Sequence, residues 1–114
     1  MLSAPQRLRR KKDFQQVYKS GKTLNTAFFR VKTVVNRQEL TRFGVVVSNK
    51  VIKKAVDRNR KKRQIRAVLR NITPTIISGY DIVLIAQQQM SHATFQQLEN
   101  DIITGFQKIH FIKQ

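Results

Sequence analysis

Three segments of the 114-residue chain repeat their apolar residues at intervals of three and four, the spacing of a helix with one buried face. These segments are residues 11–19, 55–72 and 95–109. Gly21 follows the first and Thr73-Pro74 follows the second, and both are helix stop signals. We therefore predict three helices, whose apolar positions are Phe14, Val17 and Tyr18 in the first, Ile65, Val68, Leu69 and Ile72 in the second, and Phe95, Leu98, Ile102, Phe106 and Ile109 in the third.

Three further segments have the β-branched composition of strands. Residues 28–36 and 43–48 are joined by a short polar turn, which predicts an antiparallel pair. Residues 80–86 contain the continuous run Ile82-Val83-Leu84-Ile85, which predicts a strand covered on both faces. Together the elements predict an α+β fold in the order αββαβα, with helices packed on a small central sheet. No repeat or linker interrupts residues 1–114, so we expect a single domain.

The charge of the chain is high and unevenly placed. The sequence has 23 Lys and Arg residues against 6 Asp and Glu, a net charge of +17. Residues 1–22 hold seven basic residues and one acid, and residues 53–70 hold nine and one. Residues 71–114 hold only two basic residues against three acids. We therefore expect this part of the chain to be a structural scaffold and not part of the charged surface. Because so basic a surface repels itself unless an anion lies against it, we expect a polyanionic partner.

Several classes of function lack the residues they need. The absence of cysteine excludes disulfides, thiolate nucleophiles and cysteine-ligated metal sites. The apolar runs are far shorter than the roughly 20 residues of a membrane span, and none follows the basic N-terminus as in a secretory signal. The six acids are dispersed and form no two-metal site. We expect exposed or capping roles for His92 and His110, no cofactor bound by the protein, and a cytoplasmic location.

The basic residues of the second predicted helix share one side. At about 100° per residue, four long polar side chains fall in one narrow sector, about a third of a turn from the apolar stripe. A solvated helical face normally interleaves acids at i,i+4, and none occurs between Arg58 and Arg70. We therefore interpret the sector as a phosphate-binding face. Its members are Asn59, Arg63, Arg66 and Arg70, with Arg58 and Lys62 nearer the apolar edge and Arg60 and Lys61 in other directions.

Residues 58–66, Arg-Asn-Arg-Lys-Lys-Arg-Gln-Ile-Arg, resemble the R-N-R-x-K-R-x-x-R signature of the protein subunit of bacterial ribonuclease P and match every fixed position. Residues 8–21 resemble its opening motif, L-x-x-x-x-D-F-x-x-V-[FY]-x-x-G. Residues 42–50 are similar to R-x-G-x-x-V-[SA]-K-K, and residues 81–86 to D-[YIF]-[IV]-[VIL]-[IV]-A. One basic nonapeptide is weak evidence, whereas four motifs in order across nearly the whole chain are specific.

The resemblance implies an RNA-binding accessory subunit with no catalytic centre of its own, which helps a catalytic RNA to remove 5′ leaders from precursor tRNA. It implies that the RNR helix binds this RNA, that a cleft between the first helix and the sheet holds the single-stranded leader, and that Mg²⁺ lies on the RNA. It also implies a left-handed β-α-β crossover, against the general rule. The residues carried over are Arg58, Asn59, Arg60, Lys62, Arg63, Arg66 and Arg70 for the RNA, and Arg10, Phe14, Tyr18 and Lys32 for the leader cleft, which the RNR helix borders.

At several positions the sequence leaves more than one interpretation of the leader cleft. Asn49 stands where the family usually has lysine, and Lys32 stands where some members have an aromatic residue, which exchanges stacking for charge. Phe14 and Tyr18 are also suited to a core beneath the first helix. The Phe28-Phe29 pair points to opposite faces of its strand, so one ring belongs to the core and the other is free to border the cleft.

Two other classes of protein share part of this pattern. A basic ribosomal protein explains the charged patch but not the ordered motifs. A DNA-binding regulator would use residues 55–72 as a recognition helix, but the chain lacks the short preceding helix of a helix-turn-helix. We therefore expect a catalytic RNA and a precursor tRNA leader as partners, with no DNA and no membrane.

Overall fold

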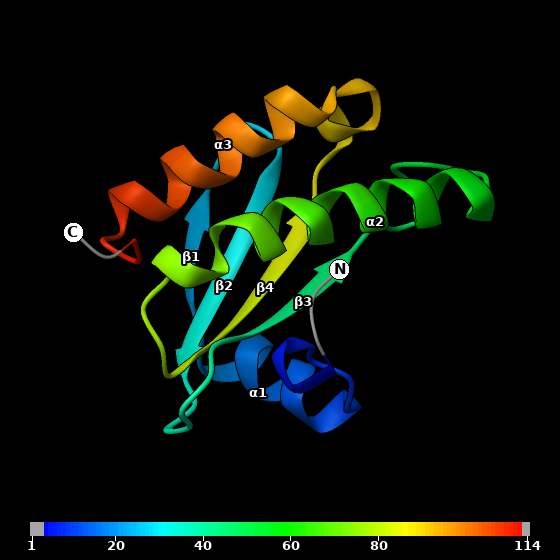
Figure 1. The fold of residues 1–114 in the computed structure, drawn as a ribbon. Helices are drawn as coiled ribbons and strands as arrows, with labels where there is room; N and C mark the ends of the chain where they lie inside the picture. The colour runs from blue at the N-terminus through cyan, green and yellow to red at the C-terminus, as the bar shows by residue number, and fades with distance from the viewer. Residues whose placement is uncertain (1–3, 113–114) are drawn as a thin grey trace.

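The computed structural model describes residues 4–112, which form three α-helices, four strands and three short 3₁₀ turns (Figure 1). The predicted α+β class is confirmed. The observed order is αβββαβα, which contains one strand, β1, more than the prediction. The sequence did not reveal β1 because Leu24 is its only apolar residue and its residues show no alternation. The helices are α1 (Lys11–Ser20), α2 (Ala55–Ile72) and α3 (Phe95–Lys108); the strands are β1 (Lys22–Asn25), β2 (Phe29–Val35), β3 (Arg42–Val46) and β4 (Tyr80–Ala86); the 3₁₀ turns are η1 (Ala4–Gln6), η2 (Thr73–Thr75) and η3 (Gln88–His92).

The strands form one mixed sheet in the order β1-β2-β4-β3. Strand β4 pairs antiparallel with β2 and parallel with β3, so Leu84 lies between Val31 and Val45. The expected antiparallel pairing of residues 28–36 with residues 43–48 is therefore wrong. Their short connection permits a hairpin, but the continuous apolar run of β4 needs cover on both faces and takes the centre of the sheet.

Helices cover both faces of the sheet. Figure 1 shows α2 and α3 on one face and α1 on the other. In that view α2 lies on the viewer's side, β3 and β4 both point upward, and β4 lies to the left of β3. This is the left-handed sense for the β3-α2-β4 unit, as the family resemblance implies and unlike most such units.

The larger hydrophobic core lies between the sheet and the helices α2 and α3. Phe29 of β2 and Phe106 of α3 are at most 1% exposed there. Phe29 is therefore the core member of its pair, and Phe28 is half-buried at the margin. Phe95 was expected in the same stripe but is 37% exposed, because it begins α3 and the helix buries its stripe only from Leu98 onward.

A smaller core lies beneath α1 on the opposite face. It consists of Leu8, Val17 and Val83, with Phe14 packed against them. Strand β4 thus contributes to both cores, as its continuous apolar run predicts. Gly44 of β3 lies under the Phe14 ring, and a Cβ there would be 2.5 Å from Phe14 Cε1. The missing side chain lets α1 approach the sheet closely.

Arg42 of β3 holds the buried carboxylate of Asp81 at the start of β4. Its Nε donates to Asp81 Oδ1 at 2.9 Å and its Nη2 donates to Oδ2 at 2.7 Å. Asn36 Nδ2 donates to Asp81 Oδ1 at 2.8 Å, and Arg42 Nη1 lies 3.5 Å from Asp13 Oδ2 of α1. The hydrogen bond to Asp81 is the main cause that raises the pKa of Arg42. These contacts join two strands, the loop after β2 and α1.

We expect Arg42→Met to lower the free energy of unfolding by about 3–5 kcal/mol. The reason is that Asp81, 4% exposed, would keep a buried carboxylate without a cation. Adding Asp81→Asn should recover much of the loss. Arg30 of β2 is exposed, so Arg30→Met is the matched control and should change stability by less than about 0.5 kcal/mol. Urea unfolding measures the stability of each variant. A loss for Arg42→Met as small as that for Arg30→Met would show that the Arg42 contacts are dispensable.

Candidate nucleic-acid interface

Helix α2 carries its basic sector about a third of a turn from its buried stripe. The helix spans the predicted residues, and Ile65, Val68, Leu69 and Ile72 are buried. No acid occurs among residues 58–70, so positive charge accumulates along the outward side. The predicted sector is only partly open to solvent. Asn59, Arg63 and Arg70 are exposed, whereas Lys62 and Arg66 are half-buried.

Three basic residues of α2 have partners within the protein. Arg58 Nη1 donates to the carbonyl oxygens of Ile52 at 3.0 Å and Lys53 at 2.6 Å, which braces the loop before the helix. Arg60 Nη1 lies 4.0 Å from Asp57 Oδ1 in an exposed ion pair. Lys61 Nζ donates to the carbonyl oxygen of Ala93, and burial lowers the pKa of Lys61. The outward side thus leaves Asn59, Lys62, Arg63, Arg66 and Arg70 for an external partner.

The residues expected in the leader cleft gather on the face of the sheet covered by α1. Phe14 is half-buried and Tyr18 is 43% exposed, with ring centroids 6.4 Å apart. Partial burial raises the pKa of Tyr18. Lys32 of β2 is half-buried and lies between residues 31 and 33, which face the larger core, so its side chain points to the α1 face. Arg10 is exposed and immediately precedes α1. Phe14 combines core packing with partial exposure, and Tyr18 is the open ring.

The two predicted surfaces lie on opposite faces of the sheet. Helix α1 covers one face and α2 the other (Figure 1). The path between them runs around the edge formed by β3, where the chain segment at Arg7 and Leu8 pairs with Phe43. The sequence counted Arg7 in the basic cluster of residues 1–22 but did not place it beside β3, because only the fold brings this segment there.

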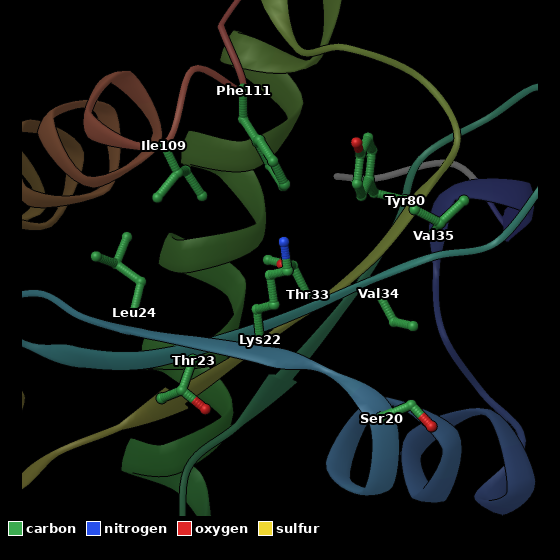
Figure 2. A pocket seen from close by; sticks show the side chains of 10 residues that line it. All are labelled: Ser20, Lys22, Thr23, Leu24, Thr33, Val34, Val35, Tyr80, Ile109 and Phe111. Carbon is green, nitrogen blue, oxygen red and sulfur yellow. The ribbon is translucent and has the colours of Figure 1, made fainter.

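A cavity of about 650 Å³ lies between the sheet, the end of α1 and the chain after α3 (Figure 2). The ring centroids of Tyr80 and Phe111 are 4.6 Å apart at this cavity. None of the residues expected to bind RNA lines it. The lining residues are Ser20, Lys22, Thr23, Leu24, Thr33, Val34, Val35, Tyr80, Ile109 and Phe111.

Three acids of the described residues serve structural contacts. Asp13 and Asp81 bind Arg42, and the Asp101 carboxylate accepts hydrogen bonds from Thr26 Oγ1 at 2.6 Å and from Phe28 N at 3.0 Å in the turn after β1. Among residues 4–112 no three histidine or acidic side chains cluster as metal ligands. In the same part of the chain no helix has the length and hydropathy needed to cross a membrane. His92 and His110 are exposed, as expected.

Comparison with known sequences gives one family. A family model described as Ribonuclease P matches residues 2–110. The ribonuclease P protein component of Cyanothece sp. strain PCC 7425 is 34% identical over 118 residues, which cover 90% of each chain. The ribonuclease P protein component of Synechocystis sp. strain PCC 6803 is 45% identical over 84 residues, covering 73% of this chain and 68% of the relative.

Solved structures agree with the sequence comparison. The RNase P protein of Staphylococcus aureus superposes with a TM-score of 0.86 and 30% identity, covering 95% of this chain and 98% of that one. The RNase P protein of Thermotoga maritima superposes with a TM-score of 0.79 and 32% identity, covering 86% and 92%. The match extends through the sheet, the helices and the RNR segment, and the chain therefore belongs to the ribonuclease P protein family.

Proposed function

We propose that the chain binds the catalytic RNA of ribonuclease P through the outward side of α2, and the 5′ leader of precursor tRNA through the α1 face of the sheet. The observation that carries the proposal is the uncompensated charge of α2, where no acid lies among residues 58–70. Family membership places the chain in tRNA processing as part of a ribonucleoprotein. We propose that residues 1–114 act as one RNA-binding domain in the cytoplasm, without a DNA or membrane partner.

Under this proposal, the RNA catalyses hydrolysis of the leader. Asp13, Asp81 and Asp101 are held in structural contacts and do not converge on a reacting atom. The RNA would hold the Mg²⁺ that the chemistry requires, and the protein binds no cofactor. The part played by the protein is to neutralise phosphates and to retain the leader, so that leader-bearing substrate binds more tightly than mature tRNA.

The two surfaces differ in how they bind RNA. The guanidiniums of Arg63 and Arg70 each offer paired N–H donors to phosphate oxygens, and such contacts position a backbone without reading its sequence. On the α1 face, the exposed Tyr18 ring offers a stacking surface to an unpaired base, and Lys32 adds charge for the backbone. Neither surface requires a particular leader sequence.

The isolated protein should cleave no precursor tRNA, and addition of its cognate RNA with Mg²⁺ should restore leader removal. An assay on protein freed of nucleic acid measures this, and cleavage by RNA-free protein would contradict the proposal. Sequencing the RNA that copurifies with the tagged protein separates the alternatives. We expect one dominant structured RNA, whereas a ribosomal protein would retain ribosomal RNA and a DNA-binding regulator little RNA.

Arg63→Ala should weaken binding to the ribonuclease P RNA and flatten the dependence of log K on log salt by about 0.7 to 0.9, the contribution of one phosphate. Arg63 is exposed and lies away from the buried stripe, so the midpoint of thermal unfolding should hardly change. Lys108→Ala removes an equal charge from an exposed position on α3 and is the matched control. Equal effects of the two substitutions would refute a localised binding face.

Tyr18→Ala should weaken binding of precursor tRNA to the ribonucleoprotein about tenfold, because stacking is worth roughly 1–3 kcal/mol per base. The salt dependence should stay unchanged, since stacking releases few counterions. Mature tRNA should bind as before, and Tyr18→Phe, which keeps the ring, should bind precursor tRNA nearly normally. Affinities for both RNAs across a salt series test this. Equal losses for mature and precursor tRNA would remove Tyr18 from the leader surface.

A further inference from the structure

The cavity of about 650 Å³ contains two polar side chains that have no partner within residues 4–112. Thr33 of β2 is only 9% exposed, and its hydroxyl makes no hydrogen bond in this part of the chain. Lys22 of β1 also lines the cavity, and it forms no ion pair there. The two residues are register partners in the antiparallel β1-β2 pair, so their side chains lie next to each other on one face of the sheet (Figure 2).

Apolar and aromatic side chains form much of the rest of the cavity wall. The rings of Tyr80 and Phe111 have centroids 4.6 Å apart, and Ile109 lies on the same wall. Two hydrogen bonds hold the chain at Phe111, because its N–H donates to Phe106 O at 2.9 Å and its carbonyl oxygen accepts from Ile77 N at 2.8 Å. The wall is therefore formed by the fold itself, and the volume of the cavity lies in the range of small-molecule sites.

We propose that this cavity binds a small organic acid, a carboxylate on an aromatic body. The ammonium group of Lys22 attracts one negative charge, and the Thr33 hydroxyl donates a hydrogen bond to the same carboxylate. The body of the ligand packs on Tyr80 and Phe111, where the burial of apolar surface adds affinity. A nucleic-acid backbone does not suit the cavity, because it needs several cations and Lys22 is the one charged side chain among the described residues that line it.

The acid site is separate from the residues that we propose to bind RNA, since none of them lines the cavity. Its lining comes from β1, β2, the start of β4 and the chain after α3, so a bound acid contacts the edge of the sheet and the end of the chain together. A ligand held by these segments stabilises the folded protein in proportion to its affinity. Binding at this site does not depend on the proposed function, and it can be measured on the protein without RNA.

The test titrates the ¹⁵N-labelled protein with three probes at fixed ionic strength and follows the backbone amide resonances. The acid 3-phenylpropionate should shift the resonances of Lys22, Thr33 and Tyr80 along a saturable curve. Its neutral amide, 3-phenylpropionamide, has nearly the same shape without the charge and should bind about tenfold more weakly. Acetate carries the charge without the aromatic body and should not saturate the site.

Substitutions identify the two polar groups of the site. Lys22→Met keeps the apolar stem and should weaken the binding of 3-phenylpropionate about tenfold, while the affinity for the amide stays unchanged. Lys19→Met is the matched control, because Lys19 is an exposed lysine of α1 that does not line the cavity. Thr33→Val should weaken binding of the acid about fivefold without lowering the midpoint of thermal unfolding, because the hydroxyl has no partner to lose. Thr33→Ser keeps the hydroxyl and should restore the affinity.

Saturable binding that Lys22→Met weakens and Lys19→Met does not would support the acid site. Equal affinities for the acid and its amide would overturn it, because the carboxylate would then contribute nothing. Equal effects of the two lysine substitutions would overturn it as well, since attraction to the net positive charge of the chain would explain the binding. An affinity that Thr33→Val leaves unchanged, or resonance shifts confined to residues outside the cavity, would also contradict the proposal.

Discussion

The ion pair between Arg42 and Asp81 is the buried interaction that holds the start of β3 and β4 together and reaches α1 as well. Removing a carboxylate from water costs several kcal/mol, so a charged Asp81 is tolerated at the start of β4 only because a guanidinium reaches it. Arg42 reaches it because the two residues are register partners in the parallel β3-β4 pair. The same guanidinium lies near Asp13, one residue before Phe14. The register of two strands therefore brings one guanidinium within reach of both Asp81 and the first turn of α1.

The protein divides its cations between structure and surface. Arg42 neutralises buried acid, Arg58 braces the loop before α2, and Lys61 binds the carbonyl of Ala93. Arg60 forms an exposed ion pair with Asp57, whereas the other cations of α2 have no ion pair among residues 4–112. These cations are Lys62, Arg63, Arg66 and Arg70. Only part of the net charge of +17 is therefore available to a partner, because some of the basic residues are held in contacts within the protein.

The local periodicity of the sequence predicted most of the helices and strands well, but it did not predict which strands lie side by side in the sheet. Helix α2 and strand β4 have the predicted bounds because each has a long, unbroken pattern. The pairing of β2 with β4 was not predictable from alternation, which says which face a side chain takes but not which strand lies beside it. The basic sector of α2 followed from helical geometry. The position of Arg7 did not, because only the bridge to Phe43 brings its segment to the edge of the sheet beside β3.

The central place of β4 has a consequence for biosynthesis. The chain is made from its N-terminus, so β1, β2, β3 and the whole of α2 leave the ribosome before the strand that joins β2 to β3. Until residues 80–86 have emerged, neither hydrophobic core contains its central strand, and the two flanking strands have unpaired edges. A nascent chain stalled before this point would carry a complete basic helix on an unclosed sheet. The sheet can therefore close only after β4 is available to pair with both of its neighbours.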